Sequence, residues 1–202
     1  MTKSLAIDSG ALAVPEPDAS GVRVYKGIPY AAPPIGSLRW RPPEPVAAWT
    51  GVRPTDGFGS HSVQGVVWDD IDLRGAATSE DCLTLNIWTP AAPGASASLP
   101  TMVWIHGGGF VVGSGAEPRY DGARLAARGI VVVTVNHRLN ALGFLAHPEL
   151  TAESDHHASG IMACTTLSQR CNGSSATSPP SAAIPTRSRS RANPPVRKRR
   201  AR

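Results

Sequence analysis

The residues best suited to chemistry are a run of glycines, His106-Gly107-Gly108-Gly109-Phe110, at the end of the mostly apolar stretch Thr101–His106. Such a stretch is typical of a buried parallel strand. Repeated glycine leaves backbone N–H groups clear of side chains, and these groups can stabilise the oxyanion that forms in acyl transfer. A glycine turn directly after a buried strand is the usual context of an oxyanion loop. A glycine-rich loop without chemistry, or a phosphate-binding turn, fits these residues alone at least as well.

Two further segments combine polar and apolar residues. In Ser79–Pro90 the acidic pair Glu80 and Asp81 stands at the start of an alternating strand, and a solvated acidic loop is the simpler interpretation. In Asn136–Leu145 a polar strand exit precedes an apolar turn, and a turn that packs in the core is the simpler interpretation. His106 is likewise expected to be structural, because the backbone does the work in an oxyanion loop.

Candidates for metal or cofactor binding are weak. Asp69, Asp70 and Asp72 lack a recognisable ligand pattern. The pair His156-His157 has no third ligand nearby in the sequence. We therefore infer no metal and no cofactor. The longest apolar run, Ile130–Val135, is far too short to cross a bilayer, so we expect no membrane partner.

The elements that position the glycine run are a strand, a helix and a second strand. Tyr120–Arg128 predicts a short amphipathic helix, with Gly129 in the position that usually ends one. Ile130–Asn136 is rich in β-branched residues and predicts a second buried parallel strand. The short connections between these elements indicate a βαβ unit.

The rest of the first 160 residues is expected to be short strands and irregular chain. Turn residues predict small antiparallel strands over 4–30, and the prolines of 31–57 exclude long helices. Leu83–Trp88 alternates and predicts a strand. Leu139–His147 is expected to lead into an irregular polar stretch around His156.

Five segments, in this order and spacing, resemble the type-B carboxylesterases: VRVYKGIPYAAPP, LRWRPPEP, SEDCLTLNIWTP, MVWIHGGGF and VNHRLNALGFL. The resemblance runs from about Gly21 to Gly160. It implies an α/β fold, the N-terminal portion of an α/β-hydrolase, with a small antiparallel region and part of the main mixed sheet. It also implies that Gly108 and Gly109 supply two of three oxyanion N–H groups, the third belonging to the residue after the nucleophile.

The resemblance implies an activity for the complete relative, which is hydrolysis of a small-molecule carboxylic ester. In that reaction a Ser attacks the carbonyl, a His acts as base and then as acid, and an Asp or Glu orients the His. No cofactor is required by this chemistry.

Other positions follow from the resemblance or depart from it. Arg39 and Glu80 match an ion pair of the family and are expected to be buried or half-buried together. Ser62 stands where secreted members carry a Cys that pairs with the equivalent of Cys82, so Cys82 is expected to be a free thiol. With no signal peptide recognised, we expect a cytoplasmic protein. Asn140 stands where Gly is usual and would be strained if the turn needs a positive φ.

The family pattern stops at Gly160, and the charge changes there. Residues 1–160 hold 11 basic and all 15 acidic residues, a net charge of −4, whereas residues 161–202 hold nine basic and no acidic residues. We therefore divide the chain into a truncated α/β-hydrolase domain, 1–160, and a disordered basic tail, 161–202. The basic run RSRSRANPPVRKRRAR could bind nucleic-acid phosphates, but another explanation accounts for it better and we do not expect nucleic acid as a partner.

That explanation is a single base lost just after the codon for Gly160. With the base restored, each new codon ends in the first two bases of the residue now present. Four family segments can then reappear in register: Asn-Tyr-Gly at Ile161–Ala163, Gln-Trp-Val at Asn172–Ser174, Phe-Gly-Gly-Asp-Pro at Ser181–Pro185 and Gly-Glu-Ser-Ala-Gly at Ala192–Val196. The literal chain is then expected to be an inactive fragment or pseudoenzyme.

Overall fold

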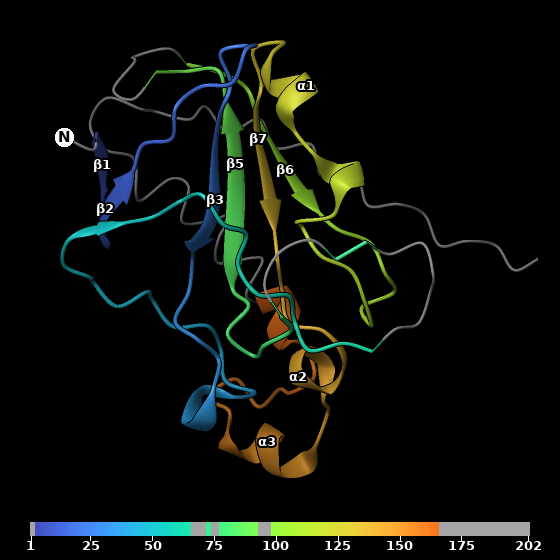
Figure 1. The fold of residues 1–202 in the computed structure, drawn as a ribbon. Coiled ribbons are helices and arrows are strands. Elements are labelled where there is room, and N and C mark those ends of the chain that lie inside the picture. The colour runs from blue at the N-terminus through green and yellow to red at the C-terminus, as the bar shows by residue number, and fades with distance from the viewer. Residues whose placement is uncertain (1–2, 66–71, 74–76, 93–97, 166–202) are drawn as a thin grey trace, which may run out of the picture.

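The computed structural model describes residues 3–65, 72–73, 77–92 and 98–165. Its centre is a four-stranded sheet in the order β3-β5-β7-β6 (Figure 1). The strands are β3 (Arg23–Pro29), β5 (Thr84–Thr89), β6 (Thr101–Ile105) and β7 (Val131–Val135). Within this sheet only β6 and β7 pair in parallel, so the sheet is mixed, as the family resemblance implies.

A smaller sheet and several short helices surround this centre. The smaller sheet contains β1 (Ser4–Ile7), β2 (Gly10–Ala13) and β4 (Val52–Arg53). The helices are η1 (Gly36–Leu38), η2 (Pro118–Tyr120), α1 (Ala123–Ala126), α2 (Asn140–Phe144) and α3 (Pro148–Glu153). Among the residues described, no helix is long and apolar enough to cross a bilayer.

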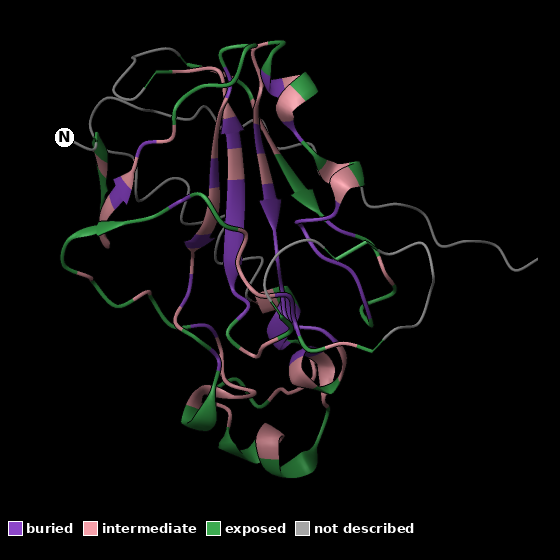
Figure 2. Cartoon of the chain, in the orientation of Figure 1, coloured by how far each residue is buried: buried purple, intermediate pink, exposed green. Residues whose placement is uncertain are grey.

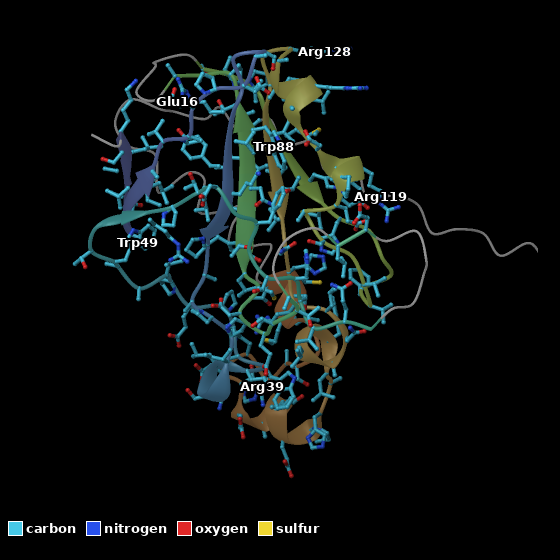
Figure 3. The ribbon with its side chains drawn as sticks, viewed as in Figure 1. Glu16, Arg39, Trp49, Trp88, Arg119 and Arg128 are labelled. Atoms are coloured by element: carbon cyan, nitrogen blue, oxygen red, sulfur yellow. The ribbon has the colours of Figure 1, made fainter. Side chains whose placement is uncertain are left out.

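The central sheet is covered on both faces where β5 and β7 lie. On one face Leu85 and Val135 pack with Leu12 of the smaller sheet, and Trp49 lies against the same cluster. On the other face Trp88 of β5, labelled in Figure 3, packs with Val132 of β7 and with Ala126 of α1. Burial of these apolar side chains on both faces stabilises the sheet and fixes its register.

The βαβ unit is confirmed, with a shorter helix than the sequence predicts. Of the expected helix Tyr120–Arg128, only Ala123–Ala126 is α-helical, and Pro118–Tyr120 forms a separate 3₁₀ turn. Gly122 separates the two, because a Cβ there would lie 2.8 Å from the Val132 side chain. The chain must pass close to the sheet at this glycine, and the helix begins only after it.

The chain around His156 is irregular, as expected, although the sequence does not predict the two short helices α2 and α3 that precede it. One expectation for the later part of the chain is wrong. The first residues of the expected tail, 161–165, are packed: Met162 and Ala163 are buried, and the Met162 carbonyl accepts a hydrogen bond from Arg138 Nη2 at 3.0 Å. A buried guanidinium requires acceptors, and these residues provide one. The rest of that segment, 166–202, lies outside the described residues.

Strand β6 has the expected position and direction but not the expected burial. Val103, Trp104 and Ile105 are 51%, 38% and 46% exposed, whereas β5 and β7 are mostly buried (Figure 2). The reason is that, among the described residues, β6 is the last strand of the sheet and has β7 on one side only. An apolar run predicts a strand that could be buried, but the neighbours that would bury it are not part of the local pattern.

The expected Arg39–Glu80 ion pair is confirmed. Arg39 Nε and Nη2 donate to the two carboxylate oxygens of Glu80 at 2.5 and 2.6 Å, and the pair is half-buried. A bidentate pair of this kind fixes orientation as well as distance. It joins the proline-rich segment after η1, near α3 in Figure 3, to the chain that enters β5.

Replacing Glu80 tests this link. The hydrogen bond from Arg39 lowers the pKa of Glu80 below its ordinary value of 4.5, so the pair stabilises the fold above pH 4.5 and less as pH falls through the folded-state pKa. We expect Glu80→Gln to lower the urea midpoint at pH 7 and to remove part of the loss of stability that wild type shows below pH 4.5. Asp81→Asn, which removes the adjacent exposed carboxylate, is the control. The same pH dependence in wild type and Glu80→Gln would contradict the assignment.

Candidate active site

The glycine run follows β6 directly and forms a tight turn. Gly108, Gly109 and Phe110 all have positive φ, at 129°, 61° and 65°. At Gly108 a Cβ would lie 1.8 Å from the carbonyl oxygen of Val112, so no other residue fits without moving the backbone. Phe110 is an aromatic residue in a region that L-residues rarely occupy. The loop therefore depends on glycine at 108 and holds Phe110 in a strained conformation.

Four consecutive backbone amides of this turn, those of residues 107–110, have no acceptor among the described residues, and they include Gly108 and Gly109. The Gly108 carbonyl, in contrast, accepts from the amides of Val111 and Val112 at 3.1 and 3.2 Å, which closes the turn. Gly109 is exposed and Gly108 half-buried. Consecutive amides that are not used by the fold can donate to an anionic oxygen.

Asn140 holds the far side of the loop. Its backbone N–H donates to the Phe110 carbonyl at 2.9 Å, and its Nδ2 donates to the Val111 carbonyl at 2.8 Å. Its φ is +53°, so the strain anticipated at this position is present. Asn tolerates this conformation better than other non-glycine residues, and its side chain supplies a contact that Gly could not.

Asn136 is the centre of a buried polar network beneath the loop. Its Oδ1 accepts from the Gly115 amide at 2.8 Å and from Ser114 Oγ at 3.2 Å, and its Nδ2 donates to the Ser60 carbonyl at 3.2 Å. Its own carbonyl accepts from the Tyr30 hydroxyl at 2.6 Å. The side chain and the backbone carbonyl of this one residue at the end of β7 thus join three segments that are distant in sequence.

Within the described residues, one Ser–His contact lies beside this network, and its role is structural. Ser114 Oγ lies 2.7 Å from His61 Nδ1, and Ser114 is fully buried. The same oxygen accepts the amide of Ala116 at 3.0 Å. A nucleophile must be accessible to substrate, so Ser114 fits a structural role and not a catalytic one.

His106 and His137 form a buried stack behind the glycine turn. Their rings are 4.5 Å apart and nearly parallel, and both residues are buried. Burial, followed by the effects of His137 and His61, lowers the pKa of His106 to about 4 and keeps it neutral at pH 7. His106 is structural, as expected, because it packs and does not face solvent.

Cys82 is a free thiol, which confirms the expectation. It is buried, and burial raises its pKa to about 11, while a hydrogen bond to Ser62 acts in the opposite direction. Ser62 therefore does stand next to Cys82. Its hydroxyl also accepts the Leu139 amide at 3.1 Å.

The other candidates from the sequence gain no support as sites. No cluster of three or more His, Cys, Asp or Glu suited to a metal occurs in the described part of the chain. Asp69 and Asp70 lie outside that part, and Asp72 is exposed within it. His156 and His157 are exposed in the turn after α3.

Sequence reasoning missed the residues that support the loop, above all Ser114, Asn136 and His61. The sequence predicts that the polar exit after β7 packs in the core, and its first three residues, 136–138, are indeed buried. The hydrogen-bond partners of Asn136 could not be read from spacing, since they lie 21 to 106 residues away.

Comparison with known proteins assigns the chain to a protein family. A profile described as "Carboxylesterase family" matches residues 9–160, which is most of the chain. The chain belongs to the carboxylesterase family. The sequence is 51% identical to the fumonisin B1 esterase of Sphingopyxis macrogoltabida over 152 residues, covering 75% of this chain and 27% of that one. It is 45% identical to the para-nitrobenzyl esterase of Bacillus subtilis (strain 168), covering 62% of this chain and 26% of that one.

Solved carboxylesterases have the same fold over the shared region. The carboxylesterase EST55 of Geobacillus stearothermophilus aligns with a TM-score of 0.71 at 38% identity, covering 84% of this chain and 33% of that one. A para-nitrobenzyl esterase structure aligns with a TM-score of 0.72 at 34% identity. The described fold is therefore part of an α/β-hydrolase, and the chain spans about a quarter of the curated relatives' length.

Substitutions at Asn140 separate two contributions to stability, its tolerance of a positive φ and its side-chain hydrogen bond to Val111. Asn140→Ala keeps the positive φ without a favourable residue and should destabilise the chain by about 1–2 kcal/mol. Asn140→Gly relieves the backbone but loses the bond to Val111, so we expect it to lie between wild type and Asn140→Ala. Urea denaturation measures the order. If the Asn140→Ala variant is as stable as wild type, the positive φ assigned to residue 140 is contradicted.

The His106–His137 stack makes stability sensitive to acid. The folded-state pKa of His106 is depressed from 6.5 to about 4, so its contribution is complete above pH 6.5 and is lost as pH falls towards 4. The full loss is on the order of 3 kcal/mol. We expect His106→Phe to reduce this dependence, whereas the exposed control His156→Phe leaves it unchanged. Equal slopes for all three proteins between pH 7 and 4 would contradict the burial of a neutral His106.

Proposed function

We propose that the glycine loop is the oxyanion site of a carboxylic ester hydrolase, with the N–H groups of Gly108 and Gly109 as two of its donors. The observation that carries the proposal is that these two amides lie within a run of amides, residues 107–110, that have no acceptor among the described residues, at the carboxyl end of a parallel strand. Preorganised donors of this kind stabilise the negative charge that develops on the carbonyl oxygen when a nucleophile attacks it. The substrate is a small-molecule carboxylic ester, as the names of the related esterases suggest.

In the complete enzyme the remaining steps belong to a Ser nucleophile, a His base and an acidic residue. The 202-residue sequence has no Gly-x-Ser-x-Gly elbow, since in Gly113-Ser114-Gly115 the glycines flank Ser114 at the wrong spacing. We therefore propose that this chain alone does not hydrolyse esters. A nucleic-acid-binding tail is the less favoured alternative, and phosphate binding that falls steeply with salt would reveal it.

We further propose that the sequence after Gly160 is read out of frame. Support comes from the family match, which stops at that residue, from the change in charge at the same point, and from the four family segments that return in register. Sequencing the locus and its messenger around codon 160 tests this. A verified gene that can be read only in the present frame would overturn it. We also propose a cytoplasmic, reducing location, supported by the buried free thiol of Cys82 next to Ser62.

One assay with a short chromogenic ester tests the function. We expect no turnover from the purified 202-residue chain and turnover from the base-restored gene. In the restored protein, Gly108→Ala should lower kcat by about 10²–10³-fold, because its Cβ would displace the oxyanion loop. Gly65→Ala is the matched control, since a Cβ there meets nothing within 4 Å.

Two results would count against the proposal. Turnover by the 202-residue chain that disappears with Gly108→Ala would mean that the nucleophile lies within this sequence. Full activity of Gly108→Ala in the restored protein would remove the oxyanion role from this loop.

A further inference from the structure

The half-buried side chain of Gln64 binds a single residue of the 113–115 turn with both ends of its amide group. Its Oε1 accepts a hydrogen bond from the Gly113 amide at 2.7 Å, and its Nε2 donates to the Gly113 carbonyl at 3.0 Å. The same Nε2 donates to the Ser62 carbonyl at 3.1 Å. A primary amide offers one acceptor oxygen and two N–H donors, and all three are used here. Two bonds to Gly113 fix its orientation as well as its distance.

Gly113 in turn packs against the start of the glycine run. Its φ is +113°, and a Cβ there would lie 2.5 Å from the Gly107 carbonyl oxygen and 2.6 Å from His106 Nδ1. That same His106 nitrogen lies 2.9 Å from the Gly107 carbonyl oxygen. The Gly107 carbonyl therefore lies against both the buried His106 ring and the backbone of Gly113.

This contact bears on the Gly108 N–H, because the Gly107 carbonyl and the Gly108 N–H belong to one planar peptide unit. Any rotation that redirects the N–H must also move the carbonyl oxygen. Glycine populates positive and negative φ about equally readily, so residues 107 and 108 offer little resistance of their own. Gly113 lies on the oxygen side of this peptide unit and opposes its rotation.

Gln64 acts between the two other supports of the loop. Asn140 binds residues 110–111, and Asn136 binds residues 114–115. The base of the Gln64 side chain is fixed as well, because the carbonyl of the preceding residue accepts a hydrogen bond from Asn140 Nδ2 at 3.3 Å. The three amide side chains together cover the chain that follows the glycines.

We propose that Gln64 is a positioning residue of the oxyanion loop. Its amide group holds Gly113 against the Gly107 carbonyl, and this contact keeps the Gly108 N–H in its donor orientation. The effect on the loop rests on these contacts alone, whereas its consequence for ester hydrolysis rests on the proposed function.

Amide NMR of the 202-residue chain tests the effect on the loop. Gln64→Met keeps the length of the side chain and removes its hydrogen bonds. We expect hydrogen exchange of the Gly113 amide to quicken about tenfold, and the Gly108 amide resonance to move. Thr55→Val is the matched control, because it removes another bond between distant segments, from Thr55 Oγ1 to the Ala13 carbonyl at 2.9 Å. The control should change neither signal.

A second variant decides the result if circular dichroism shows that Gln64→Met does not fold. Gln64→Glu has almost the same shape and keeps an acceptor for the Gly113 amide, but its carboxylate has no donor for the Gly113 carbonyl. We expect the Gly108 resonance to move in this variant too. Packing by a side chain of this size predicts no such movement.

The catalytic consequence is measured in the base-restored protein with the short chromogenic ester. A misdirected oxyanion donor weakens binding of the transition state more than binding of the substrate. Gln64→Met should therefore lower kcat by about 10–100-fold, less than loss of the loop itself, and leave KM unchanged. Thr55→Val should leave both constants unchanged.

The Gly108 resonance decides the proposal. If it does not move in a folded Gln64 variant, or moves equally in Thr55→Val, the proposal is overturned. A displaced resonance together with an unchanged kcat supports the positioning of the loop and counts against its oxyanion role. A restored wild type without turnover likewise counts against the proposed function, and the NMR result still decides the role of Gln64.

Discussion

The structure around the glycine loop depends on the hydrogen bonds made by one buried amide, that of Asn136. A buried polar side chain is costly unless its donors and acceptors are satisfied, and this one bonds to the 60s segment and the 114–115 turn. The Tyr30 hydroxyl donates a hydrogen bond to the backbone carbonyl of Asn136. Because these segments come from distant parts of the chain, the network can form only when β3, β5 and β7 are already aligned. The loop geometry is thus a consequence of the assembled sheet.

The same constraint explains why glycine and asparagine occur where they do. The turn after β6 must reverse within a few residues while leaving two amides unused, and this requires positive φ at three successive positions. Glycine provides it at two of them, and Asn140 fixes Phe110 and Val111 from behind. The strain at Phe110 lies in a loop that rests on the buried network of Asn136, and such strain is often found at functional sites.

Much of this could be predicted from the sequence, and the limits are physical. The glycine loop, the two parallel strands, the Arg39–Glu80 pair and the free Cys82 follow from local patterns or from the family resemblance. The partners of Asn136 could not be predicted, because spacing along the chain carries no information about contacts across 21 to 106 residues. The exposure of β6 was missed for a related reason. An apolar run indicates what a strand can tolerate, whereas its actual burial depends on neighbours that the run does not specify.

The central claim is that the loop is already built in this chain and holds two free donors. Amide hydrogen exchange followed by NMR tests it most directly, since the amides of Gly113 and Gly115 bond to Gln64 and Asn136 while those of Gly108 and Gly109 have no acceptor in the described part of the chain. The account predicts strong protection at Gly113 and Gly115 and fast exchange at Gly108 and Gly109. Protection at Gly108 and Gly109, or its absence at Gly113 and Gly115, would contradict it.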